Sequence, residues 1–218
     1  FFSKIFFCFP SPVRITHRRK TAMSNPPRIC KPNLTYHLVS RCIEKRNMMN
    51  DPLIKDLLID VLVMAQNKYS FEIIYYTIMD NHFHFLFRTI EDGETVSRIM
   101  QFIKSQLARR YNRKMNRTGP FWNERFKDSI IEYTDNPRFY FFWLLCYIAY
   151  NAVRSGHVRD PRNYKYTSFN AYLDPNYISP VKITLHSYFI ELGKTFEERV
   201  NKFLMYEEIY RKRLYCGI

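Results

Sequence analysis

Long apolar runs are missing from this sequence, which argues against a membrane-spanning class of protein. No stretch reaches the roughly 18 uninterrupted apolar residues that a transmembrane helix needs, so no membrane partner is expected. Glycine is scarce too, with 5 positions in 218 residues, while hydrophobic residues make up 46%. This composition is typical of a folded globular chain and excludes a disordered one.

Paired cysteine spacings are also absent. The five cysteines are scattered and contain no C-x-x-C motif: Cys8, Cys30, Cys42, Cys146 and Cys216. An odd, unpaired set argues against a disulfide framework and against a zinc site, and it favours reduced thiols in the cytoplasm.

Acidic residues are scarce in one part of the chain. Between residues 98 and 127 a single acid, Glu124, stands among nine lysines and arginines, and the whole chain carries a formal net charge of +14. Such a segment attracts polyanions, of which nucleic acid is the commonest in the cytoplasm. The alternative interpretation is a solvated helix face on a basic protein. The candidates for phosphate contacts are Arg109, Arg110, Arg113 and Lys114, followed by the weaker candidates Arg125 and Lys127.

Hydrophobic periodicity predicts alternating strands and helices. Strands are expected at 34–42, 71–79, 82–89 and, less regularly, 121–133, and helices at 53–67, 95–115, 138–153 and 196–214. This order predicts an α+β fold, a ferredoxin-like (RRM-like) antiparallel sheet with packed helices. The domain is expected at 33–175, after an irregular N-terminal extension (1–32) and before a C-terminal helical extension (176–218). Because the first methionine is Met23, residues 1–22 could precede the native start and are left out of the fold prediction.

Two histidines alternate with phenylalanines in the third predicted strand. Residues i and i+2 of a strand point to the same face, so His82 and His84 project together, opposite Phe83 and Phe85. Two adjacent neutral imidazoles can hold one divalent cation. The H-x-H pattern alone is a weak signal, and an edge strand with two structural histidines is the alternative. His37 on the first strand could also lie near such a site, although a structural role is the commoner one.

A tyrosine and an asparagine share one face of the apolar helix predicted at 138–153. Tyr147 and Asn151 are four residues apart, so they lie one above the other. A phenol and an amide placed in this way can serve one site, the phenol as nucleophile and the amide oxygen as a third metal ligand. The alternative is that Tyr147 is one more core aromatic, and neighbouring Tyr150 leaves the identity of an attacking phenol open.

Five stretches occur in an order that resembles the IS200/IS605-type single-tyrosine transposases, specifically the branch that acts on repetitive extragenic palindromes (REP). They span roughly residues 33–175: YHLVSR (36–41), MDNHFHFLF (79–87), GPFWNERFKDSIIE (119–132), YIAYNAVRSG (147–156) and YKYTSFNAYL (164–173). One departure is Asn151-Ala152, where the family usually has Asn-Pro.

The resemblance implies a ferredoxin-like HUH (His-hydrophobe-His) endonuclease of the prokaryotic cytoplasm and nucleoid. Its partner would be single-stranded or hairpin DNA, which it would cleave and rejoin through a covalent phosphotyrosine, as a monomer or homodimer. Tyr147 would be the nucleophile, and His82, His84 and Asn151 would bind Mg²⁺ or Mn²⁺. Two alternatives stay open: a former transposase that processes chromosomal repeats for its host, and a non-catalytic RRM-like nucleic-acid binder.

Overall fold

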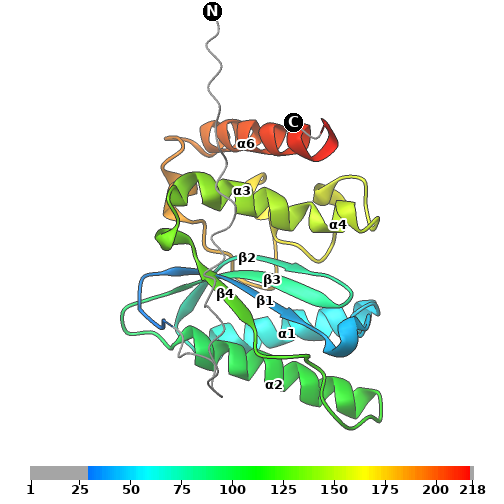
Figure 1. Cartoon of the computed structure of the whole chain (residues 1–218). Helices are drawn as coiled ribbons and strands as arrows, with labels where there is room; N and C mark the ends of the chain where they lie inside the picture. The colour runs from blue at the N-terminus through cyan, green and yellow to red at the C-terminus, as the bar shows by residue number, and fades with distance from the viewer. Residues whose placement is uncertain (1–28, 217–218) are drawn as a thin grey trace, which may run out of the picture.

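One four-stranded antiparallel sheet lies at the centre of the molecule, with strands in the order β2-β3-β1-β4 (Figure 1). The strands are β1 (Thr35–Arg41), β2 (Phe71–Ile78), β3 (His82–Thr89) and β4 (Lys127–Ile130). In the computed structural model, residues 29–216 are described, so most of the predicted N-terminal extension lies outside the described residues. This strand order and the helices packed on the sheet confirm the predicted α+β, ferredoxin-like fold.

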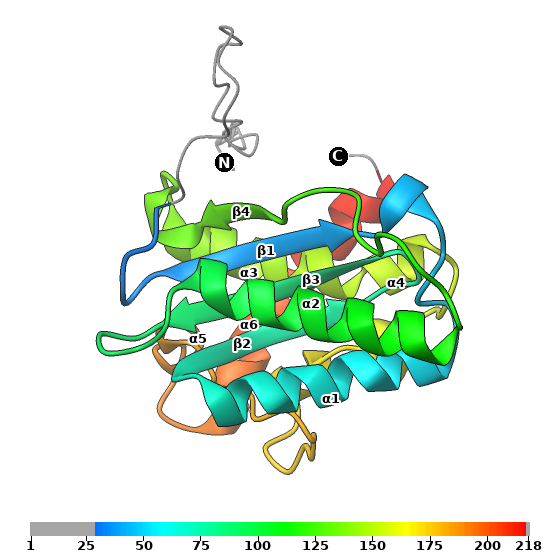
Figure 2. The same ribbon diagram turned by 90° about the horizontal axis from the view of Figure 1, so that it is seen from below.

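Two long helices cover one face of the sheet (Figure 2). They are α1 (Pro52–Lys68) and α2 (Val96–Lys114). The side chain of Asp51 accepts a hydrogen bond from the Leu53 N–H, and Thr95 caps α2 in the same way, so each helix begins at a capping residue. Their apolar faces form one core with the phenylalanines of β3.

The opposite face carries two further layers (Figure 1). The nearer layer holds α3 (Pro137–Ala149) and α4 (Asn151–Arg154), and the outer layer is α6 (Phe196–Cys216), with the short α5 (Ser187–Ile190) before it. The prediction of one continuous helix over 138–153 is wrong, because Tyr150 has ψ near 0° and interrupts the regular hydrogen-bond ladder. The C-terminal extension packs on α3, and its Phe203 is fully buried there.

The fourth predicted strand is shorter than expected. Only Lys127–Ile130 pairs with β1, and a 3₁₀ turn follows at Ile131–Tyr133. Phe121 and Phe126 both lie in the α1–α2 core, although an odd spacing of five would place them on opposite faces of a regular strand. The segment before β4 is therefore irregular. Within residues 29–216, none of the helices combines the length and apolarity that crossing a membrane requires.

Candidate active site

The two histidines of β3 lie on the sheet face that α3 covers. Phe83, Phe85 and Phe87 fill the core on the α1–α2 side, so alternation along the strand directs His82 and His84 to the other side. Their ring centroids are 5.1 Å apart with the planes nearly perpendicular, and His84 is only 5% exposed. The predicted same-face pair of imidazoles is present.

The tautomer of His82 follows from its neighbours. The amide nitrogen of Asn81 donates to the carbonyl oxygen of Lys45 at 3.0 Å, which leaves the amide oxygen of Asn81 directed at Nδ1 of His82, 2.7 Å away. An amide oxygen can only accept, so Nδ1 of His82 carries the proton. Nε2 of neutral His82 is then unprotonated, the form that can bind a cation.

His37 contacts His84 directly. Nε2 of His37 lies 2.9 Å from Nδ1 of His84, and the two rings stack with centroids 5.2 Å apart and planes 11° from parallel. The structure therefore brings His37 into the site, which the sequence left as the less favoured possibility.

All three histidines are neutral at physiological pH. Burial lowers the pKa of His37 to about 4. Burial and the nearby Arg41 charge lower the pKa of His82 to about 4, against an opposing effect of Asp80. The pKa of His84 lies well below its ordinary value, because of burial and then of the neighbouring His37 and His82. Neutral imidazoles can accept a cation, whereas imidazolium ions repel one.

Tyr147, on α3, lies beside His84 on the sheet face that α3 covers. Its ring stands edge-on to that of His84, with centroids 6.0 Å apart, so one chain supplies both the tyrosine and the histidines. At 39% exposed, Tyr147 is open to solvent, although its helix is mostly buried. The guanidinium of Arg154 lies over the Tyr147 ring, 4.5 Å from its centroid. Sequence patterning did not single out Arg154, because the turn after Tyr150 brings it back over the ring.

The amide oxygen of Asn151 already accepts a hydrogen bond. Nη2 of Arg154 donates to Oδ1 of Asn151 at 2.9 Å, and the Asn151 amide nitrogen donates to the Tyr147 carbonyl at 3.2 Å. A ligand role for Asn151 would therefore use the second lone pair of this oxygen, or the one that Arg154 would have to release.

Tyr150 points to a different part of the fold. Its hydroxyl donates to Oε1 of Glu207 on α6 at 2.8 Å, and its ring is 3% exposed. Burial, together with the carboxylate of Glu207, raises the pKa of Tyr150. Of the two neighbouring phenols, Tyr147 is the one beside the histidines.

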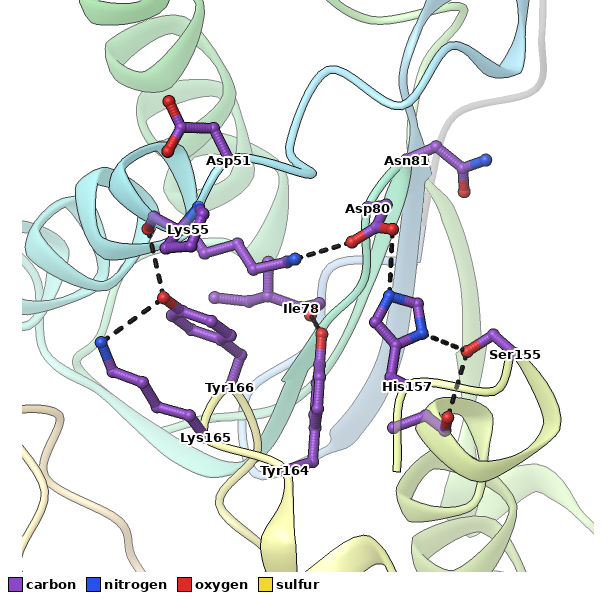
Figure 3. A network of polar contacts seen from close by, with 12 residues as sticks. Asp51, Lys55, Ile78, Asp80, Asn81, Ser155, His157, Tyr164, Lys165 and Tyr166 are labelled. Carbon is purple, nitrogen blue, oxygen red and sulfur yellow. Dashed lines mark hydrogen bonds and ion pairs between the residues drawn. The ribbon is translucent and has the colours of Figure 1, made fainter. Parts of the chain in front are cut away.

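A polar network ties the turn before His82 to the end of the tyrosine helix (Figure 3). Asp80 accepts from Nζ of Lys55 at 2.6 Å with one carboxylate oxygen and lies 3.0 Å from Nε2 of His157 with the other. His157 in turn contacts the hydroxyl of Ser155, which caps α4 by donating to the Asn151 carbonyl. Burial acts to raise the pKa of Asp80, but the hydrogen bonds from Lys55 and His157 outweigh it and lower the pKa below its ordinary value.

The predicted DNA-contacting residues lie in two places. Arg109, Arg110 and Arg113 line a hollow of about 370 Å³ on α2, on the opposite side of the sheet from Tyr147. Lys114 ends the same helix. Lys127 pairs across from Val39 on the edge strand β4, and Arg125 precedes it.

Strand pairing places two basic residues on the face of the histidines. Arg41 pairs across from His82, and Val39 pairs with both His84 and Lys127, so Arg41 and Lys127 share the face of the histidines. Sequence reasoning did not select Arg41, because its partner depends on the register of β1 against β3.

Among the residues that the structure describes, no three His, Cys, Asp or Glu side chains gather as a metal site. A cation held by His82 and His84 would therefore take its other ligands from an amide, water or a bound phosphate. Mg²⁺ and Mn²⁺ accept such oxygen ligands, so the donor set fits either ion.

Comparisons with known proteins agree with this architecture. The family model described as IS200-like transposases matches residues 30–136, which include the histidines and end just before α3. No curated protein sequence matches the chain.

A solved structure of a REP-associated tyrosine transposase bound to a REP hairpin is similar in fold, with a TM-score of 0.57 and 18% identity over 76% of this chain and 96% of that one. A putative transposase from Deinococcus radiodurans R1 matches 50% of this chain and 85% of its own with 19% identity, at a TM-score of 0.33 that is too low to bear on the fold.

The neutral histidines predict a loss of stability in mild acid. The unfolded chain takes up protons near pH 6.5, while native His37, His82 and His186, whose pKa values are lowered to about 4, do not. The free energy of unfolding should therefore fall from pH 6.5 to 5, by up to about 1.4 kcal/mol per pH unit for each such histidine. Urea titrations at a series of pH values, with a chelator present, measure this free energy of unfolding. His186→Gln should flatten the slope by about one histidine's share, and a stability that is flat over this interval would contradict the lowered pKa values.

The Asp80 network predicts a second effect on stability. Asp80→Asn leaves the charge of Lys55, which is 4% exposed, without its counter-ion, and should lower the free energy of unfolding by roughly 2–3 kcal/mol. Asp56→Asn, on the helix that carries Lys55, is the matched control, because the ion pair of Asp56 with Lys165 is exposed and its loss should cost less than about 1 kcal/mol. Equal losses for the two variants, measured by denaturant titration, would show that Asp80 contributes no more than a surface pair.

Proposed function

The chain belongs to the IS200-like transposase family, and from this membership we propose that it is a metal-dependent enzyme that cleaves and rejoins single-stranded or hairpin DNA through a covalent phosphotyrosine. The observation that carries the proposal is the position of Tyr147, exposed to solvent and 6.0 Å from the His84 ring of the same chain. A non-catalytic nucleic-acid binder would not require a solvent-accessible phenol beside two neutral imidazoles.

Tyr147 is the proposed nucleophile. Its hydroxyl oxygen forms a bond to phosphorus as the P–O3′ bond breaks. The phenol gives its proton to solvent and the departing O3′ takes one up, so the departing strand ends in a free 3′-hydroxyl. The phosphotyrosine keeps the energy of the phosphodiester, so a 3′-hydroxyl of another strand can reverse the step without ATP. Tyr150 is unsuited to this role because its hydroxyl is buried against Glu207.

His82 and His84 are the proposed ligands of Mg²⁺ or Mn²⁺, with the Asn151 amide oxygen as a third. A bound divalent ion would neutralise a non-bridging phosphate oxygen and polarise the scissile bond. The chain's own contribution is to keep both imidazoles neutral and on one sheet face. Arg154 donates a hydrogen bond to the Asn151 oxygen. We propose that a DNA phosphate competes for Arg154 and so releases Asn151.

Arg154 has a second proposed role at the nucleophile. A guanidinium over a phenol ring stabilises negative charge that develops on the oxygen as the proton is lost. Arg154 also hydrogen-bonds the hydroxyl of Tyr210 on α6, which fixes it from the outer layer.

The proposed DNA partner contacts two separated surfaces. The similar solved structure is that of a protein bound to a REP hairpin, and a hairpin with a single-stranded tail is the substrate that we propose here. The arginines of α2 and the tyrosine lie on opposite faces of the sheet. One DNA molecule that reaches both must pass around an edge, and Arg125 and Lys127 provide positive charge at the β4 edge.

The nucleophile is tested by two single-oxygen deletions. Tyr147→Phe should cost little stability, because the ring is partly exposed, and should abolish both cleavage and the denaturation-resistant protein–DNA adduct. Tyr150→Phe removes a buried hydrogen bond and should lower the free energy of unfolding by roughly 1–3 kcal/mol while the adduct still forms.

Both variants are incubated with hairpin-tailed single-stranded DNA and Mn²⁺, analysed by denaturing electrophoresis, and any adduct is mapped by mass spectrometry. A phosphate carried by Tyr150, or cleavage by Tyr147→Phe, would overturn the assignment.

Removing positive charge from α2 tests the proposed role of this helix in DNA binding. Arg109→Gln together with Arg113→Gln should weaken binding to all DNA sequences alike and reduce the slope of log K against log salt by up to about 2, since each lost phosphate contact removes about 0.9. The adduct should still form at saturating DNA, because α2 is remote from Tyr147. The matched control is Arg211→Gln with Lys212→Gln on α6, which removes the same charge elsewhere. Equal slopes for the two double variants would mean that α2 has no special part in binding.

A further inference from the structure

We infer that His37 is a positioning residue: it accepts a hydrogen bond from Nδ1 of His84 and so fixes the tautomer in which Nε2 of His84 is unprotonated and free to bind a cation. This inference rests on the proposed function and adds to it a residue from a second strand. Neither the resemblance nor the predicted site assigned a role to His37.

The register of β1 against β3 brings His37 and His84 together in a defined orientation. β1 and β3 pair so that His37 stands opposite Leu86 and His84 stands opposite Val39. The two histidines are therefore diagonal neighbours on one sheet face, within reach of long side chains. Their nitrogens are 2.9 Å apart and their rings nearly parallel, so the bond sets the rotation of the His84 ring as well as its proton.

His82 provides an independent parallel. Its Nδ1 must donate to Asn81, because the Asn81 amide is oriented by the Lys45 carbonyl. If Nδ1 of His84 donates to His37 in the same way, Nε2 of both neighbouring histidines is unprotonated and available to a cation. Each histidine would then bind a cation through Nε2 and be held by a hydrogen bond from Nδ1. Neighbouring groups commonly orient metal-binding histidines in this way.

A ligand role for His37 itself is the less fitting alternative. Its Nε2 is already engaged by His84, and residues 29–216 contain no group of three His, Cys, Asp or Glu side chains that could hold a metal. His37 therefore acts through His84.

Three variants separate orientation from folding. His37→Leu removes the acceptor and keeps a buried side chain, while His37→Gln keeps a polar group close to the position of Nε2. Thr35→Val is the matched control. It lies on the same strand and face and gives up a hydrogen bond to another buried histidine, Nε2 of His186, at 3.0 Å, away from the His82–His84 pair.

The first measurement needs neither metal nor DNA. The ¹⁵N shifts of the His84 ring in the full-length, metal-free protein above pH 7 should show a protonated Nδ1 in the parent and in Thr35→Val. They should show a mixture of tautomers, or protonated Nε2, in His37→Leu. A parent in which Nε2 of His84 carries the proton would overturn the inference, even if no variant folds.

The second measurement is the affinity for Mn²⁺ without DNA, by electron paramagnetic resonance. His37→Leu should bind about 10–100-fold more weakly, as loss of such orienting groups typically does, with His37→Gln recovering most of the affinity and Thr35→Val close to the parent. His37→Leu binding Mn²⁺ as tightly as the parent would contradict the inference. A parent that binds no Mn²⁺ would instead contradict the proposed function, and the tautomer measurement would still decide the role of His37.

Discussion

The alternation of β3 between two buried faces is the constraint on which the site depends. Three phenylalanines of this strand fill the core against α1 and α2, and a slip of one residue in register would move all three out of this core to the α3 face. The cost of losing this packing holds His82 and His84 on the α3 side, whatever polar contacts they make. A hydrophobic core on one face of the sheet thus fixes the histidine pair on the other face. The short contacts with Asn81 and His37 then determine the orientations of the two rings.

The tyrosine helix is held differently, by polar contacts with the layers around it. Glu207 of α6, only 3% exposed, accepts from the Tyr150 hydroxyl and from Arg162 at 2.6 Å, and Asp80 joins α1 to the segment after α4. Buried ion pairs contribute little net stability, because desolvation offsets their attraction, but their geometry tolerates little displacement. They also require α6 to be present. The C-terminal helix, which lies beyond the matched family range, is for this reason part of the support of Tyr147.

Sequence patterning predicted what depends on local periodicity. The bounds of β3, the shared face of its histidines and the extents of α1 and α2 follow from neighbours within a few residues. The contact between His37 and His84 could not be predicted, because it depends on the register of strands 47 residues apart in the chain. The interruption at Tyr150 was missed for a similar reason. Its surroundings in the outer layer come from residues about 57 positions further on, whereas local propensity favours a continuous helix.

The separation of α2 from the candidate site shows how two sequence signals can fall on different surfaces of one fold. Charge density selected Arg109 and Arg113, and chemistry selected Tyr147 and the histidines, yet the sheet lies between the two groups. A phosphate bound on α2 is therefore not the phosphate that Tyr147 would attack. The positive groups that can act on the reacting phosphate are those on the histidine face. Strand pairing and the turn after α3 place them there: Arg41, Lys127 and Arg154. If α2 binds DNA and Tyr147 attacks it, as proposed, affinity for DNA and reaction at DNA are physically separable in this fold, because the sheet lies between the two groups.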